Sequence, residues 1–426
     1  MMDTDTLAPA APPSLWHNHD FTKLWAGQTV SLFGTLLSRV ALPFIAVLLL
    51  HATAAQMAVL TALEVIPAML LGLFVGHLVD RTSRRMVMLL ADSSRAIVPI
   101  VITLAYVTHT LRLEHLYVVA ALMSVLTVFF DVAYPAYLPT VVGRAHLLAG
   151  NTRMEASAAL AEVGGFSLSG VVVQMLGGPF AMVIDSLTYV VSAISLAFIR
   201  TPEPAREPVA SHDDEVKRPG EIWAGARAIT REPLRLALAS AEALTGLAQN
   251  MIGTVFFIFV ARDLPLHPAE LGVIFGIGGV ASFLAALYVP RLTARFGVGR
   301  VIVLAGGIAA AASFLLPLAR GPVWVLIAIL VIGQLSDAPA TMAIINRNSL
   351  LQAITPDALQ GRVHGAVRAV AAFANLAGIM LGGVLGSVLG ARSTIAFACV
   401  VEVGVVLLLA LSPVRRVHTM LTTPLE

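Results

Sequence analysis

Charged residues are scarce in this sequence. They make up 12% of the 426 residues, whereas hydrophobic residues make up 58%. Soluble domains carry about 25% charged residues, and a folded interior cannot bury this much apolar surface. A soluble fold is therefore excluded, and lipid is the expected solvent. The net charge of +2 also argues against a nucleic-acid partner.

Cysteine and cofactor motifs are almost absent as well. The single cysteine, Cys399, lies in an apolar run, which excludes an intramolecular disulfide. The sequence contains no HExxH, P-loop or CxxC motif, so we expect no metal, no cofactor and no ATP-driven pump. No basic segment precedes an apolar one in residues 1–20, which favours a short disordered tail over a cleavable signal peptide.

Long apolar runs dominate the remaining sequence. A membrane-spanning helix needs about 20 apolar residues, and several runs here are long enough to require tilting. Twelve candidate spans are expected, at residues 22–50, 56–79, 86–108, 115–141, 148–175, 180–200, 235–260, 269–293, 299–319, 322–347, 364–389 and 392–413.

One extended polar stretch divides the spans into two sets of six. Residues 200–233 are rich in proline and mixed charge, and we expect an amphipathic helix over 220–232. The predicted organisation is all-α, with these parts: a cytoplasmic tail (1–20), a six-helix bundle (21–200), a cytoplasmic linker (201–233), a second six-helix bundle (234–413) and a second tail (414–426).

Basic residues predict the orientation. Lysines and arginines gather in the loops on one side of the predicted membrane, and the loops on the other side carry one arginine each. The positive-inside rule therefore places both termini and the linker in the cytoplasm. The arginines of the opposite side are Arg112, Arg262, Arg320 and Arg392.

The two halves share a weak internal repeat. A shift of 214 residues aligns GHLVDRTSRR (76–85) with PRLTARFGVG (290–299), so that Arg81 matches Arg295 and Ser83 faces Gly297. Asp80 falls on Ala294, which means that the second copy is degraded. Together with equal span counts, the repeat predicts two pseudo-symmetric bundles.

The loop between the second and third spans resembles the signature loop of the major facilitator superfamily. The match is Gly76-x-x-x-Asp80-Arg81-x-x-Arg84-Arg85, with Ser83 where a glycine is usual. Three segments (19–43, 78–96 and 351–365) look most like bacterial exporters of the macrolide-efflux and enterobactin-exporter type. The fifth span departs from the exporter pattern, because Gly165 is followed by Phe166 and not by proline.

The resemblance implies how the halves move. Helices two and eleven pair across the halves in this superfamily, as do helices five and eight, and glycines concentrate in these spans. Gly76 follows Gly72 by four residues, a spacing that permits close helix approach in lipid. Asp80 is expected just before the third helix, where the positive helix end favours a carboxylate. The loop arginines are expected to pair with acids at the cytoplasmic ends of helices, in one conformation only. The expected switch residues are Gly76, Asp80, Arg81, Arg84, Arg85, Asp92 and Arg95.

Ionisable residues at membrane depth are functional candidates because burying them is costly. Asp92 and Arg95 share a helix face and favour a structural ion pair, and Glu402, on a peripheral helix, also favours a structural role. Asp185, Glu242 and Glu155 lie nearer span ends. The expected proton-coupling residues are Asp131, Glu162, Asp337 and Glu64, and Arg39 is expected to pair with Asp131, Glu64 or Glu162.

The resemblance also places spans one, four, seven and ten around a cavity. Their aromatic and amide side chains suit an amphiphilic organic solute better than a sugar or an inorganic ion. The expected substrate-binding residues are Arg39, Gln28, Thr35, Phe130, Tyr134, Tyr137, Gln249, Asn250, Phe257 and Gln334.

The predicted function is export of amphiphilic small molecules by proton antiport, with no catalytic residue, by a monomer in a bacterial inner membrane. An importer, a facilitator and a lysophospholipid flippase are same-fold alternatives. An intramembrane enzyme is suggested only by GFSLSG (165–170), and no histidine lies at mid-membrane to activate its serines. A transport-dead sensor or scaffold is disfavoured by the buried carboxylates.

Overall fold

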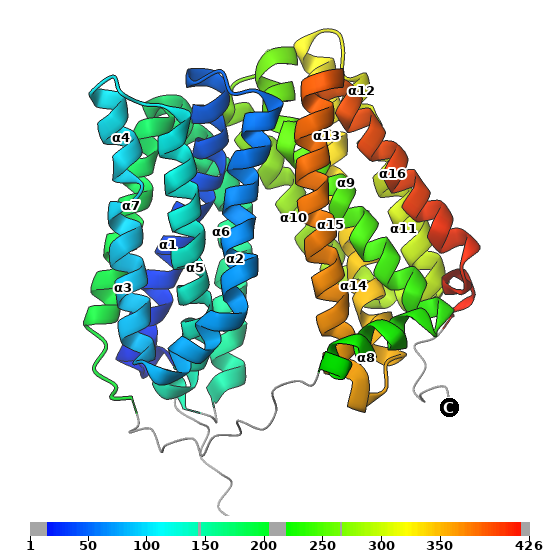
Figure 1. Ribbon diagram of the computed structural model, residues 1–426, viewed down its shortest axis with the longest axis horizontal. Coiled ribbons are helices and arrows are strands. Elements are labelled where there is room, and N and C mark those ends of the chain that lie inside the picture. The colour runs from blue at the N-terminus through cyan, green and yellow to red at the C-terminus, as the bar shows by residue number, and fades with distance from the viewer. Residues whose placement is uncertain (1–14, 144–145, 204–218, 265, 419–426) are drawn as a thin grey trace, which may run out of the picture.

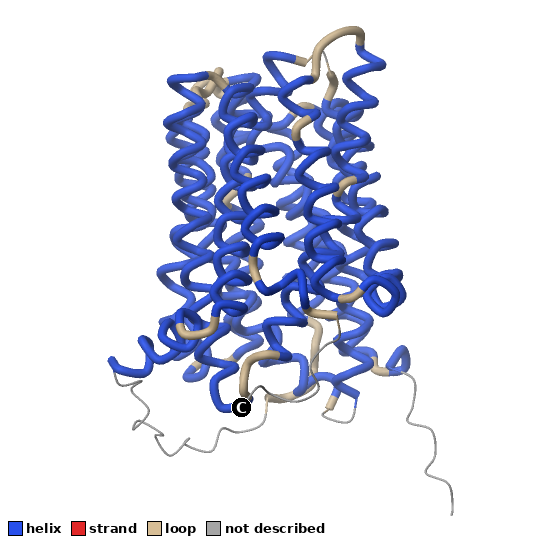
Figure 2. The backbone as a smooth tube through the Cα atoms, turned by 90° about the vertical axis from the view of Figure 1, so that its right-hand side faces the viewer, coloured by secondary structure: helices blue, strands red, loops and turns tan. Residues whose placement is uncertain are grey.

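The chain forms two helical bundles that stand side by side (Figure 1). The computed structural model describes residues 15–143, 146–203, 219–264 and 266–418. Within these residues the regular structure is helical, as Figure 2 shows. The predicted tails lie partly outside the described residues, at 1–14 and 419–426, as does most of the linker, at 204–218.

The first bundle contains six spans. It consists of α1 (His19–Phe44) with a π-helical end (Ile45–Leu49), α2 (Ala54–Arg81), α3 (Arg84–Ile97) with α4 (Ile100–Val107), α5 (Leu113–Val142), α6 (Leu147–Leu176) and α7 (Gly178–Ala197).

The second bundle repeats this plan after α8 (Pro219–Thr230), which lies where the linker pattern indicated an amphipathic helix. It consists of α9 (Pro233–Asp263), α10 (Pro268–Phe296), α11 (Val298–Ser313) with α12 (Leu315–Leu318), α13 (Val323–Leu335) with α14 (Asp337–Ala353), α15 (Gln360–Leu389) and α16 (Ala391–Leu411). In the described part of the chain, twelve segments are long and apolar enough to span a membrane, which confirms the predicted number.

Three spans are broken, each near a proline: Pro99 lies in the break between α3 and α4. Pro317 and Pro339 lie four residues after the last residues of α11 and α13, Ser313 and Leu335. A proline ring clashes with the carbonyl four residues earlier and removes a helical hydrogen bond. The break after Leu335 makes Asp337 the first residue of α14, whereas the sequence pattern had placed it inside a continuous helix.

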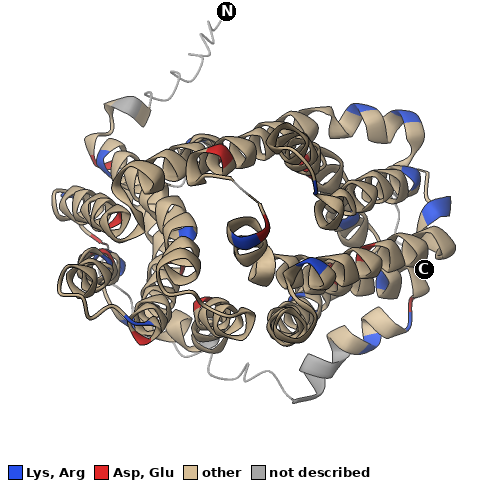
Figure 3. Cartoon of the chain, turned by 90° about the horizontal axis from the view of Figure 1, so that it is seen from above, with Lys and Arg blue, Asp and Glu red and all other residues tan. Residues whose placement is uncertain are grey.

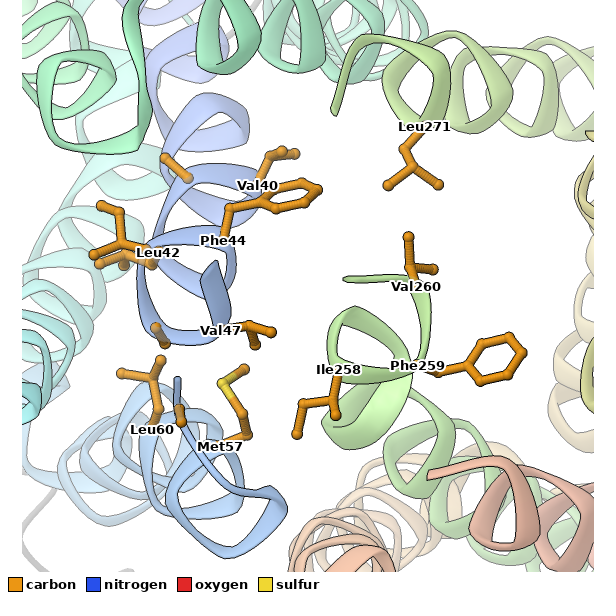
Figure 4. Close-up of a cluster of buried hydrophobic side chains, with 14 of the residues drawn as sticks. Val40, Leu42, Phe44, Val47, Met57, Leu60, Ile258, Phe259, Val260 and Leu271 are labelled. Atoms are coloured by element: carbon orange, nitrogen blue, oxygen red, sulfur yellow. The ribbon is translucent and has the colours of Figure 1, made fainter. Parts of the chain in front are cut away.

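The bundles share one core at the end away from the chain termini. We call the side of the molecule where α1 begins and α16 ends the terminal side, and the other side the distal side. A continuous cluster of buried side chains at the distal side joins α1 and α2 to α9 and α10 (Figure 4). It includes Phe44, Met57 and Phe259. On the terminal side each bundle has a separate core.

Small residues make the distal contact close. A Cβ on Gly170 of α6 would lie 2.8 Å from the Cα of Gly272 of α10, and one on Gly383 of α15 would lie 2.4 Å from the Cβ of Ala58 of α2. Nearby, Ser167 Oγ donates to the Gly272 carbonyl over 3.1 Å. The predicted pairs, span two with span eleven (α2 with α15) and span five with span eight (α6 with α10), are therefore in contact through their distal halves.

Candidate functional site

The signature loop belongs to a capping structure on the terminal side. Ser83 is the N-cap of α3 and accepts a hydrogen bond from Met86 N. The Glu203 carboxylate, beyond the end of α7, accepts from Ser83 Oγ (2.8 Å), Arg84 N (3.1 Å) and Arg85 N (2.7 Å). A carboxylate is favoured there by the positive end of the helix dipole. The sequence did not predict this role of Glu203, because Glu203 and Ser83 are 120 residues apart in the chain and meet only in the folded structure.

In this conformation Arg84 and Arg85 of the signature loop donate to backbone carbonyls. The pairing with acids that the family resemblance implies for one conformation stays a prediction. Arg84 Nη1 donates to the Ala136 carbonyl of α5 over 2.8 Å. Arg85 donates through Nε and Nη2 to the last carbonyls of α7, at 3.0 and 2.6 Å. A cation is favoured at the carbonyl end of a helix. These arginines therefore hold α3, α5 and α7 together.

Asp80, Arg81 and Gly76 lie at the end of α2. Asp80 is part of the last turn of α2, so Glu203, and not Asp80 as predicted, caps the following helix. Asp80 and Arg81 are exposed. A Cβ built on Gly72 or Gly76 would have no neighbouring atom within 4 Å. The close approach that their spacing permits is therefore not made in this conformation.

Arg95 organises the interior of the first bundle. Its side chain is 4% exposed, donates to the fully buried Asp92, and lies over the Phe130 and Tyr189 rings at 4.4 and 4.7 Å. Such cation–π contacts strengthen where water is absent. Arg95 also interacts electrostatically with Asp131 of α5 and Asp185 of α7. The predicted structural role of the Asp92–Arg95 pair agrees with this geometry.

Arg39 is the second arginine of this network. It lies on α1, is exposed, and interacts electrostatically with Glu64 of α2 and Asp131 of α5. Two of its three predicted partners are therefore close to it. Glu162, the third, is exposed on α6, and the structure gives it no hydrogen bond or ion pair with another described residue. The network places four acids, Glu64, Asp92, Asp131 and Asp185, around two arginines, so the acids outnumber the arginines and can take up protons. Figure 3 shows the charged residues of the two bundles from above.

Several residues predicted to line a substrate site lie inside the first bundle. Gln28 Nε2 donates to Ser192 Oγ over 3.4 Å, and Thr35 Oγ1 lies 2.9 Å from Tyr189 Oη, so both join α1 to α7. Phe130 is 3% exposed and stacks on Tyr134, and Tyr137 is fully buried. Their packing, which sequence position alone does not reveal, places them between helices.

The second bundle contains a cavity of about 370 Å³. Four predicted residues line it: Gln249 and Phe257 of α9, Gln334 of α13 and Asp337 of α14. Asn250 does not, because its Nδ2 donates to the Gly246 carbonyl of its own helix over 2.9 Å. The sequence prediction missed the other lining residues, among them Phe256, Phe275, Ser313, Arg347 and Glu402.

Two acids of this cavity differ in their surroundings. The Glu402 carboxylate accepts from Gln249 Nε2 and is 7% exposed. Asp337 packs beside Gln334 against Gly278 of α10, where a Cβ would lie 2.5 Å from Asp337 Oδ2. The cavity thus joins carboxylates to aromatic walls, a combination suited to an amphiphilic ligand. Among the described residues, no group of three or more histidine, cysteine or acidic side chains is placed to hold a metal ion.

Comparison with known proteins identifies the family. The family model described as "Transmembrane secretion effector" matches residues 8–425. The uncharacterised MFS-type transporter YfiS of Bacillus subtilis (strain 168) is 26% identical over 86% of this chain and 87% of its own length. The multidrug efflux pump Tap of Mycolicibacterium fortuitum is 27% identical over 88% of this chain and 90% of its own length.

Solved structures support the fold. A bacterial homologue of the iron transporter ferroportin in its inward-facing state gives a TM-score of 0.68 at 16% identity, covering 92% of this chain and 99% of that one. The outward-facing state of a bacterial ferroportin homologue gives 0.54 at the same identity, covering 92% and 98%. The chain therefore belongs to the transmembrane secretion effector family of the major facilitator superfamily, a family of multi-pass membrane transporters.

Proposed function

We propose that this protein is a secondary active transporter that exports amphiphilic small molecules across a bacterial inner membrane in exchange for protons. The observation that carries the proposal is the unequal contact between the bundles. Two buried clusters join them on the distal side, the large one described above and a small one between α2 and α15, and each bundle has a separate core on the terminal side. Two bundles that meet at one end only are suited to alternating access, in which the site opens to each side in turn.

The conformation described here is proposed to be the inward-facing one. In support, the fold matches the inward-facing ferroportin homologue better than the outward-facing one, at equal sequence identity. With both termini in the cytoplasm, as the basic residues predict, the separated terminal side faces the cytoplasm. Substrate then enters from the inside and leaves after the distal contacts open.

The coupling step is proposed to occur at the arginine–carboxylate network of the first bundle. Protonation of Asp131 releases Arg39 and displaces bound substrate. Glu162, the second proposed proton carrier, lies outside this network in the described conformation. The bundles then rock about the α2–α15 and α6–α10 contacts, and the loop at 76–85 stabilises the outward-open form. The support is that Arg39 already interacts with Asp131 and Glu64 from different helices, so that neutralising one acid changes the balance of charge across the bundle.

Export is favoured over import by the relationship to the multidrug efflux pump Tap. An importer, a facilitator and a lysophospholipid flippase remain same-fold alternatives, and the ferroportin homologue shows that this fold also occurs in proteins named for metal transport. An intramembrane enzyme or a transport-dead sensor fits the charged network less well.

The test is transport by purified protein in proteoliposomes with an imposed pH gradient, screened over dyes, macrolides and siderophores. We expect accumulation that requires the gradient and collapses with a proton ionophore. Transport that ignores the gradient would exclude proton antiport, and no transport of any amphiphile would exclude the proposed cargo class.

A further inference from the structure

The cavity of the second bundle lies within that bundle, and not between the two bundles. Its walls come from α9, α10, α11, α13, α14 and α16, with Leu316 added by α12. Small residues on α11, among them Gly306 and Ala309, leave the space open. At about 370 Å³ the cavity falls in the size range of sites for drug-sized ligands.

The Glu402 carboxylate in this cavity is incompletely satisfied. Gln249 of α9 donates to Oε1, and the Ser313 hydroxyl of α11 is a second hydrogen-bonding neighbour. Oε2 is buried and has no hydrogen-bond partner in the described structure. Buried carboxylate oxygens normally have partners, and an unpaired one in a native structure calls for an explanation such as a missing ligand.

None of the described residues that line the cavity pairs a positively charged side chain with the Glu402 carboxylate. Arg347 of α14 is the lining arginine, and it donates to Glu242 of α9. The other titratable groups near Glu402 are Asp337, across the cavity wall on α14, and the thiol of Cys399, one turn away on α16. Two carboxylates therefore share one cavity with an arginine that already has a partner.

The remaining walls suit a large apolar body. Phe256 and Phe257 of α9 are in edge contact, with ring centroids 5.7 Å apart, and Phe275 of α10 lies 5.7 Å from Phe256. Aromatic faces attract cations as well as apolar groups. Ionised Glu402 and Asp337 would repel an anionic ligand and would be compensated by a cationic one, whereas with a neutral ligand they must take up protons to avoid a buried charge.

We propose that this cavity binds amphiphilic organic cations, with Glu402 as the anionic anchor for the positive charge and the phenylalanine cluster as the contact for the apolar body. The proposal specifies the cargo class of the proposed function and rests on it for transport, but not for binding. A proton and the cation compete for the same carboxylate, so that cation binding weakens as the pH falls.

The test is equilibrium binding to the full chain in lipid nanodiscs at pH 8. The probes are tetraphenylphosphonium, a cation with an apolar body, and triphenylphosphine oxide, a neutral relative of similar shape. We expect Glu402→Gln to weaken tetraphenylphosphonium binding by about tenfold or more, because one member of a desolvated charge pair is lost, and to leave the neutral probe unaffected. Equal cation binding by the variant and the unmodified protein would overturn the proposal, as would equal loss of both probes.

Two further variants separate charge from shape. Gly306→Leu should weaken both probes, because a Cβ there has its nearest neighbour at 3.9 Å and a larger side chain extends into the cavity. Glu270→Gln is the matched control: it removes an acid that lies at the distal start of α10 and outside the cavity, and both probes should bind normally. Normal cation binding by Gly306→Leu would place the probe elsewhere.

A pH series on the unmodified protein keeps the test decisive if Glu402→Gln does not fold. Tetraphenylphosphonium affinity should fall between pH 8 and pH 5.5 while that of the neutral probe stays constant, and pH-independent binding would overturn the proposal. The export proposal can fail independently of the binding proposal. A protein that binds tetraphenylphosphonium but transports no amphiphile in proteoliposomes would support the binding site and contradict the proposed export.

Discussion

At the scale of single residues, the two arginines of the first bundle lie in different environments. Arg95 is buried between two aromatic rings and donates to Asp92, so it is fixed in place. Arg39 is exposed and interacts with two acids from two helices. The fixed arginine stabilises the bundle, whereas the exposed one is free to change partners when an acid gains a proton.

Replacing Asp131 tests this difference. Asp131→Asn keeps the shape of the side chain but removes the negative charge, so it should abolish pH-driven transport and leave the protein folded. Proteoliposome uptake after a pH jump measures the first effect, and thermal unfolding in detergent measures the second. Normal gradient-driven efflux by Asp131→Asn would show that Asp131 does not carry the coupling proton. The same assay on Glu162→Gln tests the second proposed carrier.

Glu203 provides a second prediction at this scale. Glu203→Ala removes the acceptor for Ser83 and for two backbone amides of α3, and the loss of a helix cap costs about 1 kcal/mol. The midpoint of thermal unfolding should therefore fall. Asp263→Ala is the control, because this exposed acid lies in the last turn of α9, where a negative charge is unfavourable. An unchanged midpoint for Glu203→Ala would show that the cap is not used in the membrane.

Charges are rare in membrane spans, so the sequence suggests Asp131, Glu64 and Glu162 as partners of Arg39. The structure places Asp131 and Glu64 near Arg39 and leaves Glu162 apart, and the roles of these residues stay predictions. Glu402 received a structural role because its helix is peripheral. Whether a peripheral helix borders a cavity depends on small residues such as Gly306 on a neighbouring helix, and that relation is not local in the sequence.

At the scale of elements, glycines decide how closely helices approach. A Cβ on Gly170 would lie 2.3 Å from the Pro268 carbonyl oxygen, so Gly170→Val must push α6 away from α10. We expect a greater distance between labels on introduced cysteines at residues 109 and 320, both in exposed distal loops, measured by pulsed electron paramagnetic resonance. Gly404→Val is the control, since its Cβ would meet nothing within 4 Å. An identical distance distribution in both variants would contradict the closed distal contact.

Gly76 should behave differently from Gly170. It has no neighbour here, so Gly76→Leu should leave thermal stability unchanged. If α2 approaches α15 on the terminal side during transport, the added side chain obstructs that state and lowers the rate of turnover. Transport rates in proteoliposomes, compared with those of Gly404→Leu, measure the effect, and an unaltered rate would exclude a close approach at Gly76.

Helix positions were largely predictable because lipid thickness fixes their length, and helix breaks were less so. The sequence predicts one helix for the span containing Asp337, since apolar residues lie on both sides of Asp337 as far as Ile345. The break results from the backbone clash of Pro339 with residue 335. A proline is tolerated in many membrane helices, so its presence alone does not predict a break.

At the scale of the whole molecule, the orientation in the membrane determines whether the terminal side, where the two cores are separate, faces the cytoplasm. The positive-inside rule predicts that a fluorescent protein fused after residue 426 will fluoresce, whereas alkaline phosphatase fused there will be inactive. A phosphatase fusion at Arg320, in a distal loop, should be active. Reversed activities would invert the orientation, and the described conformation would then open outward.

The capping of α3 by the chain that follows α7 has a counterpart in the second bundle. The Val417 and His418 carbonyls, beyond α16, accept hydrogen bonds from Gly299 N (2.9 Å) and Val298 N (3.3 Å) at the start of α11. Gly297, with φ of 86°, and Gly299, where a Cβ would lie 1.9 Å from the Val414 carbonyl oxygen, permit this close approach. In each half, the segment leaving the sixth span thus covers the start of the third.

This arrangement sets an order of assembly during synthesis. The third span of each half is synthesised before the residues that accept hydrogen bonds from its first backbone amides. Three more spans must be translated before those acceptors are available. The third span of the first half can therefore be covered before the second half is translated, whereas that of the second half is covered only once residues 417 and 418 have been made. A nascent chain stopped before residue 417 would present an uncovered helix end to the quality-control proteases of the cell.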